Sequence, residues 1–189
     1  MIARERENML SSKKLGALVV LAGVLFVAAV SVCGASARVK SDSRVTAVEY
    51  EARVVAKINI VRRSHGLSQL RLSVLLERSA RQHSQQMAAG GYFSHDSWDG
   101  TSYVDRIKRF FSPRGYRYWS VGENLLWASP SASPEDVVER WLSSPAHRAV
   151  ILSPSWRVIG VGVVGASRGH GIYSGGPVEL VTADFGVRC

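Results

Sequence analysis

An acidic residue lies inside a run of small and apolar residues, Ser120-Val121-Gly122-Glu123-Asn124-Leu125. A carboxylate in such surroundings costs free energy unless a cation or a hydrogen-bond donor contacts it. Two imidazoles on loops far away in the sequence are suitable partners, His95 before this run and His147 after it. We therefore predict that His95, Glu123 and His147 converge on one small polar cleft.

Two neutral imidazoles and one carboxylate form a donor set that can bind zinc and leave one coordination position for water. A water molecule bound in this way has a pKa lowered toward neutrality and can attack a substrate. The same groups could equally form a structural cluster in which Glu123 accepts hydrogen bonds from both histidines. The sequence therefore leaves three roles open: structure or ligand orientation, weak binding of a divalent cation, and catalysis.

Serine catalysis is not favoured by the serines beside these histidines. Ser94 adjoins His95 and Ser144 lies near His147, but adjacent side chains point apart and no Gly-x-Ser-x-Gly motif is present. We expect Ser144 to lie at a helix end. His83 is expected to be a buried structural histidine on a helix.

Tryptophans near the predicted cleft are candidates for contact with a ligand. Trp98 and Trp119 are the two that we assign to this role. Trp141 has helical spacing to Val137 and Val138, which favours a place in the core.

The elements that must position these residues are mostly helices in the first part of the chain and strands in the last. Apolar spacing, capping serines and stop glycines predict helices over residues 48–65, 73–90, 103–111 and 134–144, with one more turn over 147–152. Strands are predicted over 158–164 and 178–185, with a third over 117–121, and residues 122–124 are interpreted as a turn. This order favours an α+β layered domain over a βαβ repeat.

The amino-terminal segment has the layout of an export signal. Basic residues within 1–14 precede an uncharged apolar run over 15–32 and the small residues 35–37. The alternative is an uncleaved membrane anchor, because the apolar run is near the lower limit of length for spanning a bilayer. Lipid attachment at Cys33 is disfavoured by Val32 before it. We therefore divide the chain into a signal or anchor (1–37), a linker (38–47) and one domain (48–189), with the domain outside the cytoplasm.

The domain carries most of the positive charge. The formal charge of the chain is +9, and residues 1–37 contribute four basic and two acidic residues, which leaves +7 for the remainder. A basic protein associates with polyanions such as anionic lipid heads or wall polymers, although a merely solvated basic surface is the simpler interpretation. The chain has no nucleic-acid-binding motif. Cys189 would be the one cysteine left after removal of the signal.

Short motifs in a fixed order resemble the CAP superfamily, named for cysteine-rich secretory proteins, antigen 5 and pathogenesis-related proteins. The main ones are Phe93-Ser94-His95, Val121-Gly122-Glu123-Asn124, Trp141-Leu142-Ser143-Ser144-Pro145-Ala146-His147-Arg148 and Thr182-Ala183-Asp184-Phe185-Gly186. The resemblance implies a three-layer α-β-α sandwich with a cleft lined by two histidines and two acidic residues, which in the family often hold zinc. Carried over, His95, Glu123 and His147 occupy three of these positions, and Ser143 and Ser144 occupy the region of the second acid.

Together the motifs and the resemblance favour a secreted or surface-tethered bacterial protein whose cleft binds a lipid, a peptide or a wall component, with zinc or another divalent cation as the candidate cofactor. The alternative is a metal-assisted extracellular hydrolase or protease. A purely structural envelope protein is the third hypothesis, and no motif favours it. Activities differ widely among proteins of one fold, so the reaction has to be argued from the site.

Overall fold

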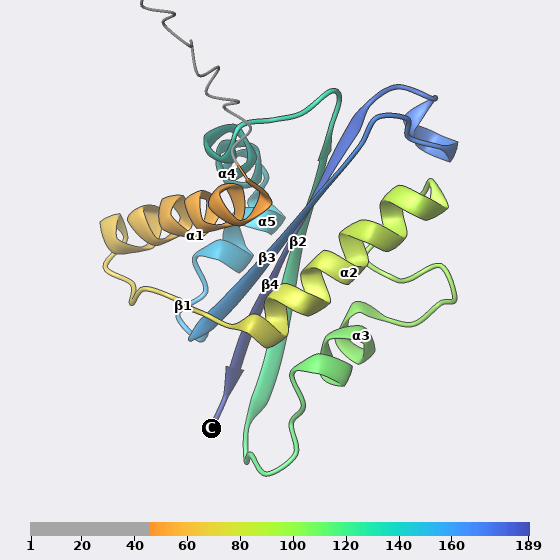
Figure 1. Ribbon diagram of the computed structural model, residues 1–189. Coiled ribbons are helices and arrows are strands. Elements are labelled where there is room, and N and C mark those ends of the chain that lie inside the picture. The colour runs from red at the N-terminus through yellow and green to blue at the C-terminus, as the bar shows by residue number, and fades with distance from the viewer. Residues whose placement is uncertain (1–45) are drawn as a thin grey trace, which may run out of the picture. The chain divides into compact units, whose positions relative to one another are not determined.

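The computed structural model describes residues 46–189 as five α-helices and a four-stranded mixed sheet (Figure 1). The helices are α1 (Ala47–Ser64), α2 (Val74–Gly90), α3 (Tyr103–Phe110), α4 (Pro134–Ser143) and α5 (Pro145–Ile151). The strands are β1 (Arg71–Leu72), β2 (Trp119–Ala128), β3 (Val158–Ala166) and β4 (Val178–Arg188), with a 3₁₀ turn at Gly171–Tyr173. Their order in the sheet is β1-β3-β4-β2; β1 is parallel to β3 and the other pairs are antiparallel.

Helices cover both faces of the sheet, which confirms the α+β fold and its three layers (Figure 1). Helices α1, α4 and α5 pack on one face, and α2 and α3 pack on the other. The main core lies between the sheet and the first group of helices and includes Ile58, Trp141 and Phe185. Trp141 is 1% exposed and its indole Nε1 donates to the Leu125 carbonyl at 2.9 Å, which confirms its predicted place in the core.

Helix starts follow the predicted capping residues. The hydroxyls of Ser73, Ser102 and Ser133 each accept a hydrogen bond from the backbone N–H three residues later, at the start of α2, α3 and α4. Pro145, interpreted from the sequence as the end of α4, also begins α5, because the first turn of a helix tolerates a residue without a backbone N–H. Ser144 lies between these two helices, as expected.

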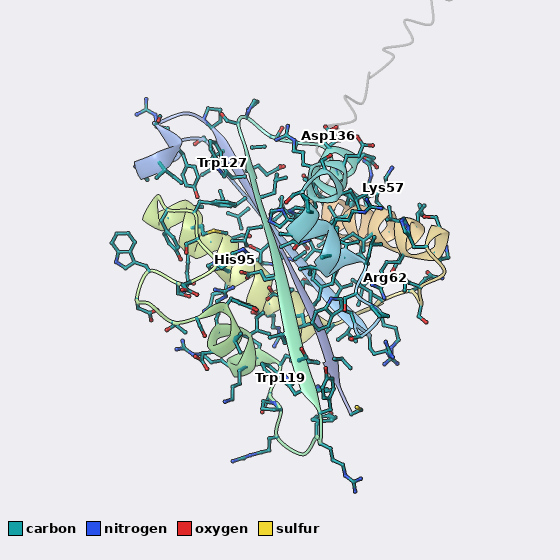
Figure 2. The ribbon with its side chains drawn as sticks, turned by 180° about the vertical axis from the view of Figure 1, so that it is seen from behind. Lys57, Arg62, His95, Trp119, Trp127 and Asp136 are labelled. Atoms are coloured by element: carbon teal, nitrogen blue, oxygen red, sulfur yellow. The ribbon has the colours of Figure 1, made fainter. Side chains whose placement is uncertain are left out.

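The predicted turn at residues 122–124 is wrong: this segment lies in the middle of β2. Gly122 and Asn124 are typical of turns, but here their backbone groups pair with β4, with Glu123 opposite Asp184. Gly122 serves packing and not a turn, because a Cβ at this position would lie 2.8 Å from the Trp156 ring. Strand β2 therefore carries Glu123 between two helical layers, and Trp119 and Trp127 lie toward its opposite ends (Figure 2).

Two glycines allow α2 to approach β3 closely. A Cβ at Gly160 would lie 2.0 Å from the Glu77 backbone nitrogen, and one at Gly162 would lie 2.2 Å from the Arg81 backbone nitrogen. The side-chain hydroxyl of Ser84 uses this proximity to donate to the Gly162 carbonyl at 2.9 Å. The strand backbone is therefore in direct contact with the helix that carries His83.

The predictions for the amino-terminal signal or anchor (1–37), including its apolar run (15–32) and Cys33, and for most of the linker (38–47) fall outside the described residues. Within residues 46–189, no helix is both long enough and apolar enough to cross a bilayer. Cys189 is exposed with a free thiol.

Candidate functional site

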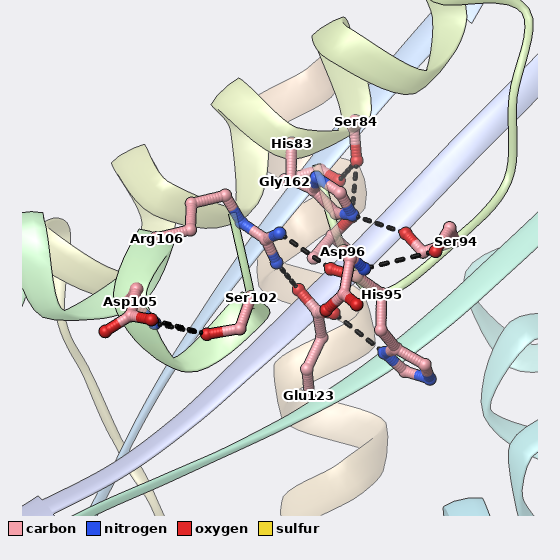
Figure 3. Close-up of polar contacts among 11 residues, drawn as sticks. His83, Ser84, Ser94, His95, Asp96, Ser102, Asp105, Arg106, Glu123 and Gly162 are labelled. Carbon is pink, nitrogen blue, oxygen red and sulfur yellow. Dashed lines mark hydrogen bonds and ion pairs between the residues drawn. The ribbon is translucent and has the colours of Figure 1, made fainter. Parts of the chain in front are cut away.

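The Glu123 carboxylate is the buried centre of the site, and both of its oxygens have partners (Figure 3). The Oε1 atom lies 2.8 Å from His95 Nδ1, and the Oε2 atom forms an ion pair with the Arg106 guanidinium. The side chain of Glu123 is fully buried and that of Arg106 is 2% exposed. The cation and the donor that a buried carboxylate requires are therefore Arg106 and His95.

Arg106 was missed by the sequence analysis. It lies on the short helix α3 among exposed basic residues, Lys108 and Arg109, and its sequence context resembles theirs. Its Nη1 atom also donates to the His95 carbonyl at 2.8 Å, so one guanidinium holds both the carboxylate and the backbone of the histidine loop. Its spacing of three residues from Tyr103 and four from Phe110 is the signal that the sequence offers, because residues at this spacing lie on one side of a helix.

Asp184 supplies a second acid that the sequence analysis did not assign to the site. It lies opposite Glu123 on β4 and is fully buried next to Glu123 and Ser79. Burial, followed by the charge of Glu123, raises the pKa of Asp184 well above its ordinary value. Burial also raises the pKa of Glu123, but the Arg106 charge opposes this shift. Since Glu123 has the cation, the proton of the pair resides on Asp184.

His95 presents one ring nitrogen to solvent. Its side chain is 49% exposed, and burial followed by the Arg106 charge lowers its pKa, so the imidazole is neutral at pH 7. An ionised Glu123 can only accept hydrogen bonds, so Nδ1 of His95 must carry the hydrogen. The other nitrogen, Nε2, is then a fixed hydrogen-bond acceptor or metal ligand at the protein surface.

His147 lies on α5 close to this pair without a hydrogen bond to Glu123 within the described chain. Its backbone carbonyl accepts from Asn124 Nδ2 at 3.1 Å, which ties α5 to β2. Burial, followed by repulsion from His95, lowers the pKa of the His147 imidazole. The structure thus brings His95 and Glu123 into contact and leaves His147 as a partly exposed neighbour of His95.

A zinc ion at this site would need three protein donors that are free to turn toward it. In the part of the chain from Thr46 onward, no group of three or more His, Cys, Asp or Glu side chains is arranged to hold a metal. Glu123 already contacts Arg106 and His95, and Asp184 is buried behind it. This arrangement does not fit a site with three protein ligands, and we derive no chemical step that uses a metal. The predicted binding of zinc or another divalent cation by His95, Glu123 and His147 stays a prediction.

The loop over residues 92–99 is held by two buried side chains. His83 Nε2 contacts the Ser94 carbonyl at 2.8 Å, and Arg106 contacts the next carbonyl, that of His95. His83 is completely buried, as predicted for a structural histidine. This loop therefore presents His95 on a fixed backbone.

The same loop carries the most exposed tryptophan of the described chain. Trp98 is 79% exposed, and its ring lies 5.9 Å from that of Tyr92. The two rings line a groove of about 400 Å³ together with the polar side chains of Gln86, Ser97 and Asp99. Trp119, the other tryptophan predicted near the cleft, is half-buried, and its Nε1 donates to the Phe111 carbonyl at 2.7 Å.

His83 makes the protein sensitive to acid. Burial, followed by the Arg106 charge, lowers the pKa of His83 to about 4. Its contribution to stability is complete above pH 6.5, the ordinary pKa, and is lost as the pH falls from 6.5 to 4, a loss of roughly 3 kcal/mol. In His83→Gln, which retains a donor, the free energy of unfolding from urea titrations should vary less over this range. The exposed His65→Gln is the control; an equally steep profile in His83→Gln would contradict this assignment.

The sequence is similar to that of a known protein family and to two proteins of Bacillus subtilis. The sequence profile of the cysteine-rich secretory protein family, CAP, matches residues 55–183. The uncharacterized protein YkwD of Bacillus subtilis is 40% identical over 115 residues, covering 61% of this chain and 42% of YkwD. The uncharacterized membrane protein YlbC of the same organism is 31% identical over 116 residues, covering 60% of this chain and 31% of YlbC. The chain thus spans less than half the length of either relative.

Solved structures share the fold. An extracellular protein containing an SCP domain from Bacillus anthracis superposes with a TM-score of 0.57 and 26% identity, covering 72% of this chain and 39% of that protein. An outer surface protein from Borrelia burgdorferi superposes with a TM-score of 0.55 and 20% identity, covering 72% of this chain and 90% of the other.

Proposed function

This chain belongs to the cysteine-rich secretory protein (CAP) family, and from that premise we propose that it is an extracytoplasmic binding domain that recognises a glycan of the bacterial cell wall. Two observations support a location outside the cytoplasm. The amino-terminal sequence has the layout of an export signal or anchor, and the similar Bacillus anthracis protein is described as extracellular.

The observation that carries the proposal is the orientation of His95 by the buried Glu123. The hydrogen bond of 2.8 Å at Nδ1 leaves Nε2 of a neutral imidazole as a fixed acceptor at the surface. Sugar hydroxyls and amide N–H groups are donors that such an acceptor can bind. The ion pair with Arg106 favours the charged form of Glu123, which accepts the hydrogen bond from His95 Nδ1.

The groove lined by Trp98, which shares its loop with His95, combines an aromatic face with polar groups. Trp98 offers a flat exposed surface, and Gln86, Ser97 and Asp99 offer hydrogen-bonding groups next to it. An aromatic ring has an apolar face that can cover the C–H face of a sugar ring, while the polar groups around it bind the hydroxyls. One rigid loop, residues 92–99, contributes both His95 and Trp98.

The test is co-sedimentation of the purified protein with insoluble peptidoglycan sacculi. We expect Trp98→Ala and His95→Gln each to weaken binding by about tenfold, the effect of losing roughly 1.4 kcal/mol. Trp127→Ala, which removes a partly exposed tryptophan from the far end of β2, is the matched control and should bind normally. Unchanged binding in both loop variants, or no binding by the parent protein, would contradict the proposal.

The alternative is a metal-assisted hydrolase. It has one observation in its favour: a carboxylate that orients a histidine, as Glu123 does, is common behind metal-ligating imidazoles. Melting and sedimentation assays, each repeated with zinc and with chelator, distinguish the binding domain from the hydrolase. A gain in melting temperature with zinc that is lost in His95→Gln and His147→Ala, together with release of soluble wall fragments, would favour the hydrolase.

A further inference from the structure

A second site lies at the end of the sheet where β4 ends and β3 begins. Here a cavity of about 400 Å³ is lined by three arginines, Arg71, Arg157 and Arg188, and by no acidic residue. Each arginine comes from a different segment: β1, the residue before β3, and the end of β4. None of the three has a carboxylate within 4.0 Å among residues 46–189.

Two of these guanidiniums are held in place before any ligand arrives. Arg188 stacks on Phe111 and Tyr116, with its Cζ atom 4.2 and 4.7 Å from the ring centroids, and its Nη1 donates to the Ser112 carbonyl at 3.1 Å. Arg157 uses its Nη1 to donate to the carbonyls of Pro154, Ser155 and Trp156 at 2.7–3.1 Å. Fixed guanidiniums lose little conformational entropy when they bind an anion, and their geometry matches phosphate oxygens.

The rim of this cavity is apolar as well as basic. Leu72 is 65% exposed and Tyr116 is 43% exposed, and both line the cavity; Val74 and Tyr118, close to them in the chain, are also exposed. Exposed leucine and tyrosine beside arginine is the composition that partitions into the headgroup region of a bilayer. An anion free in water would require the arginines but not these apolar side chains.

We propose that this end of the domain docks on an anionic phospholipid surface, with one headgroup phosphate bound in the arginine-lined cavity. The charge of the body, +7 for residues 38–189, complements such a surface. The cavity shares no residue with the loop over 92–99. Arg188, which lines the cavity, pairs with Trp119, and Asp184 pairs with Glu123. The cavity is therefore four residues along the strands from the Glu123–Asp184 pair, a distance of about 13 Å. Membrane docking and recognition of the wall are therefore separable.

The test is calorimetric titration of the full chain with dihexanoyl phosphatidylglycerol below its micelle concentration, so that residues 1–45 have no bilayer to enter. Arg71 makes no side-chain hydrogen bond or ion pair to any other described residue, so Arg71→Glu can be made without loss of an internal polar contact. We expect this variant to bind about tenfold or more weakly, and Arg71→Lys to retain most of the affinity. The matched control is Arg168→Glu, an exposed arginine in the loop between β3 and β4, which should bind normally.

A titration with inorganic phosphate identifies the source of the phosphate. Leu72→Ser should weaken binding of the lipid severalfold, and the lipid should bind more tightly than inorganic phosphate. Equal affinities for the two, with no effect of Leu72→Ser, would overturn membrane docking and assign the cavity to a soluble phosphate. Absence of lipid binding, or equal losses in Arg71→Glu and Arg168→Glu, would overturn the site.

Discussion

Arg106→Met is expected to lower the free energy of unfolding by about 3–5 kcal/mol at pH 7. The variant removes the cation that pairs with Glu123 and leaves two acidic side chains, Glu123 and Asp184, buried side by side. An unpaired buried charge costs far more than the pair itself contributes, because the desolvation of the remaining ion is no longer offset. The measurement is urea or thermal unfolding followed by circular dichroism, with the exposed Arg109→Met as control.

The pH dependence gives this prediction a second, independent readout. Burial raises the pKa of Glu123 to about 7 although the Arg106 charge lowers it, so loss of Arg106 raises this pKa further. The carboxyl of the variant is ionised only at higher pH, and the difference in unfolding free energy from the parent protein should therefore grow as the pH rises above 7. Glu123→Leu should also be destabilising, since it strands Arg106. The double variant Arg106→Met/Glu123→Leu should lose less than the sum of the two single variants. Additive losses, or normal melting of Arg106→Met, would contradict the assigned ion pair.

Gly160→Ala is expected to prevent stable folding, with a loss of about 3 kcal/mol or more, because the added methyl group would overlap the α2 backbone at Glu77. The clash is with main-chain atoms, so rotation of a side chain cannot relieve it, and α2 would have to move away from β3. Movement of α2 would also disturb the loop that carries His95, because His83 on α2 contacts the Ser94 carbonyl of that loop. We expect a low yield of soluble protein and, where protein is recovered, a lowered melting temperature.

Gly165→Ala on the same strand is the control for this experiment. A Cβ at Gly165 meets no atom within 4 Å, so the substitution should leave the melting temperature nearly unchanged. If Gly160→Ala and Gly165→Ala melt alike, then α2 does not pack against β3 as closely as described.

Helices were predicted well because their signals are local. A capping serine such as Ser133, a proline in the first turn and apolar residues at helical spacing all act within one segment, so Pro134–Ser143 can be located without knowledge of the fold. The contact between His95 and Glu123 was also anticipated, because a carboxylate in an apolar run needs a partner.

The parts that were missed depend on long-range pairing. Strand β4 lies between β3 and β2 with helices on both faces, so nearly all of its residues are buried, Asp184 included. In a sheet that helices cover on both sides, both faces of a central strand are buried. The alternation of residues along such a strand therefore does not show which polar side chains face solvent. The turn predicted at Gly122 and Asn124 was wrong for a related reason. These residue types favour turns, but pairing with the neighbouring strand β4 determines their conformation here.

The central position of β4 also makes the sheet depend on this one strand. Strands β2 and β3 have no hydrogen bonds to each other and are joined only by residues 178–188, the last segment of the described chain. Until this segment arrives, each of them exposes an open edge that can pair with another molecule. Chains that lack this segment, during synthesis or after cleavage by proteases, are therefore expected to aggregate more readily than the folded domain.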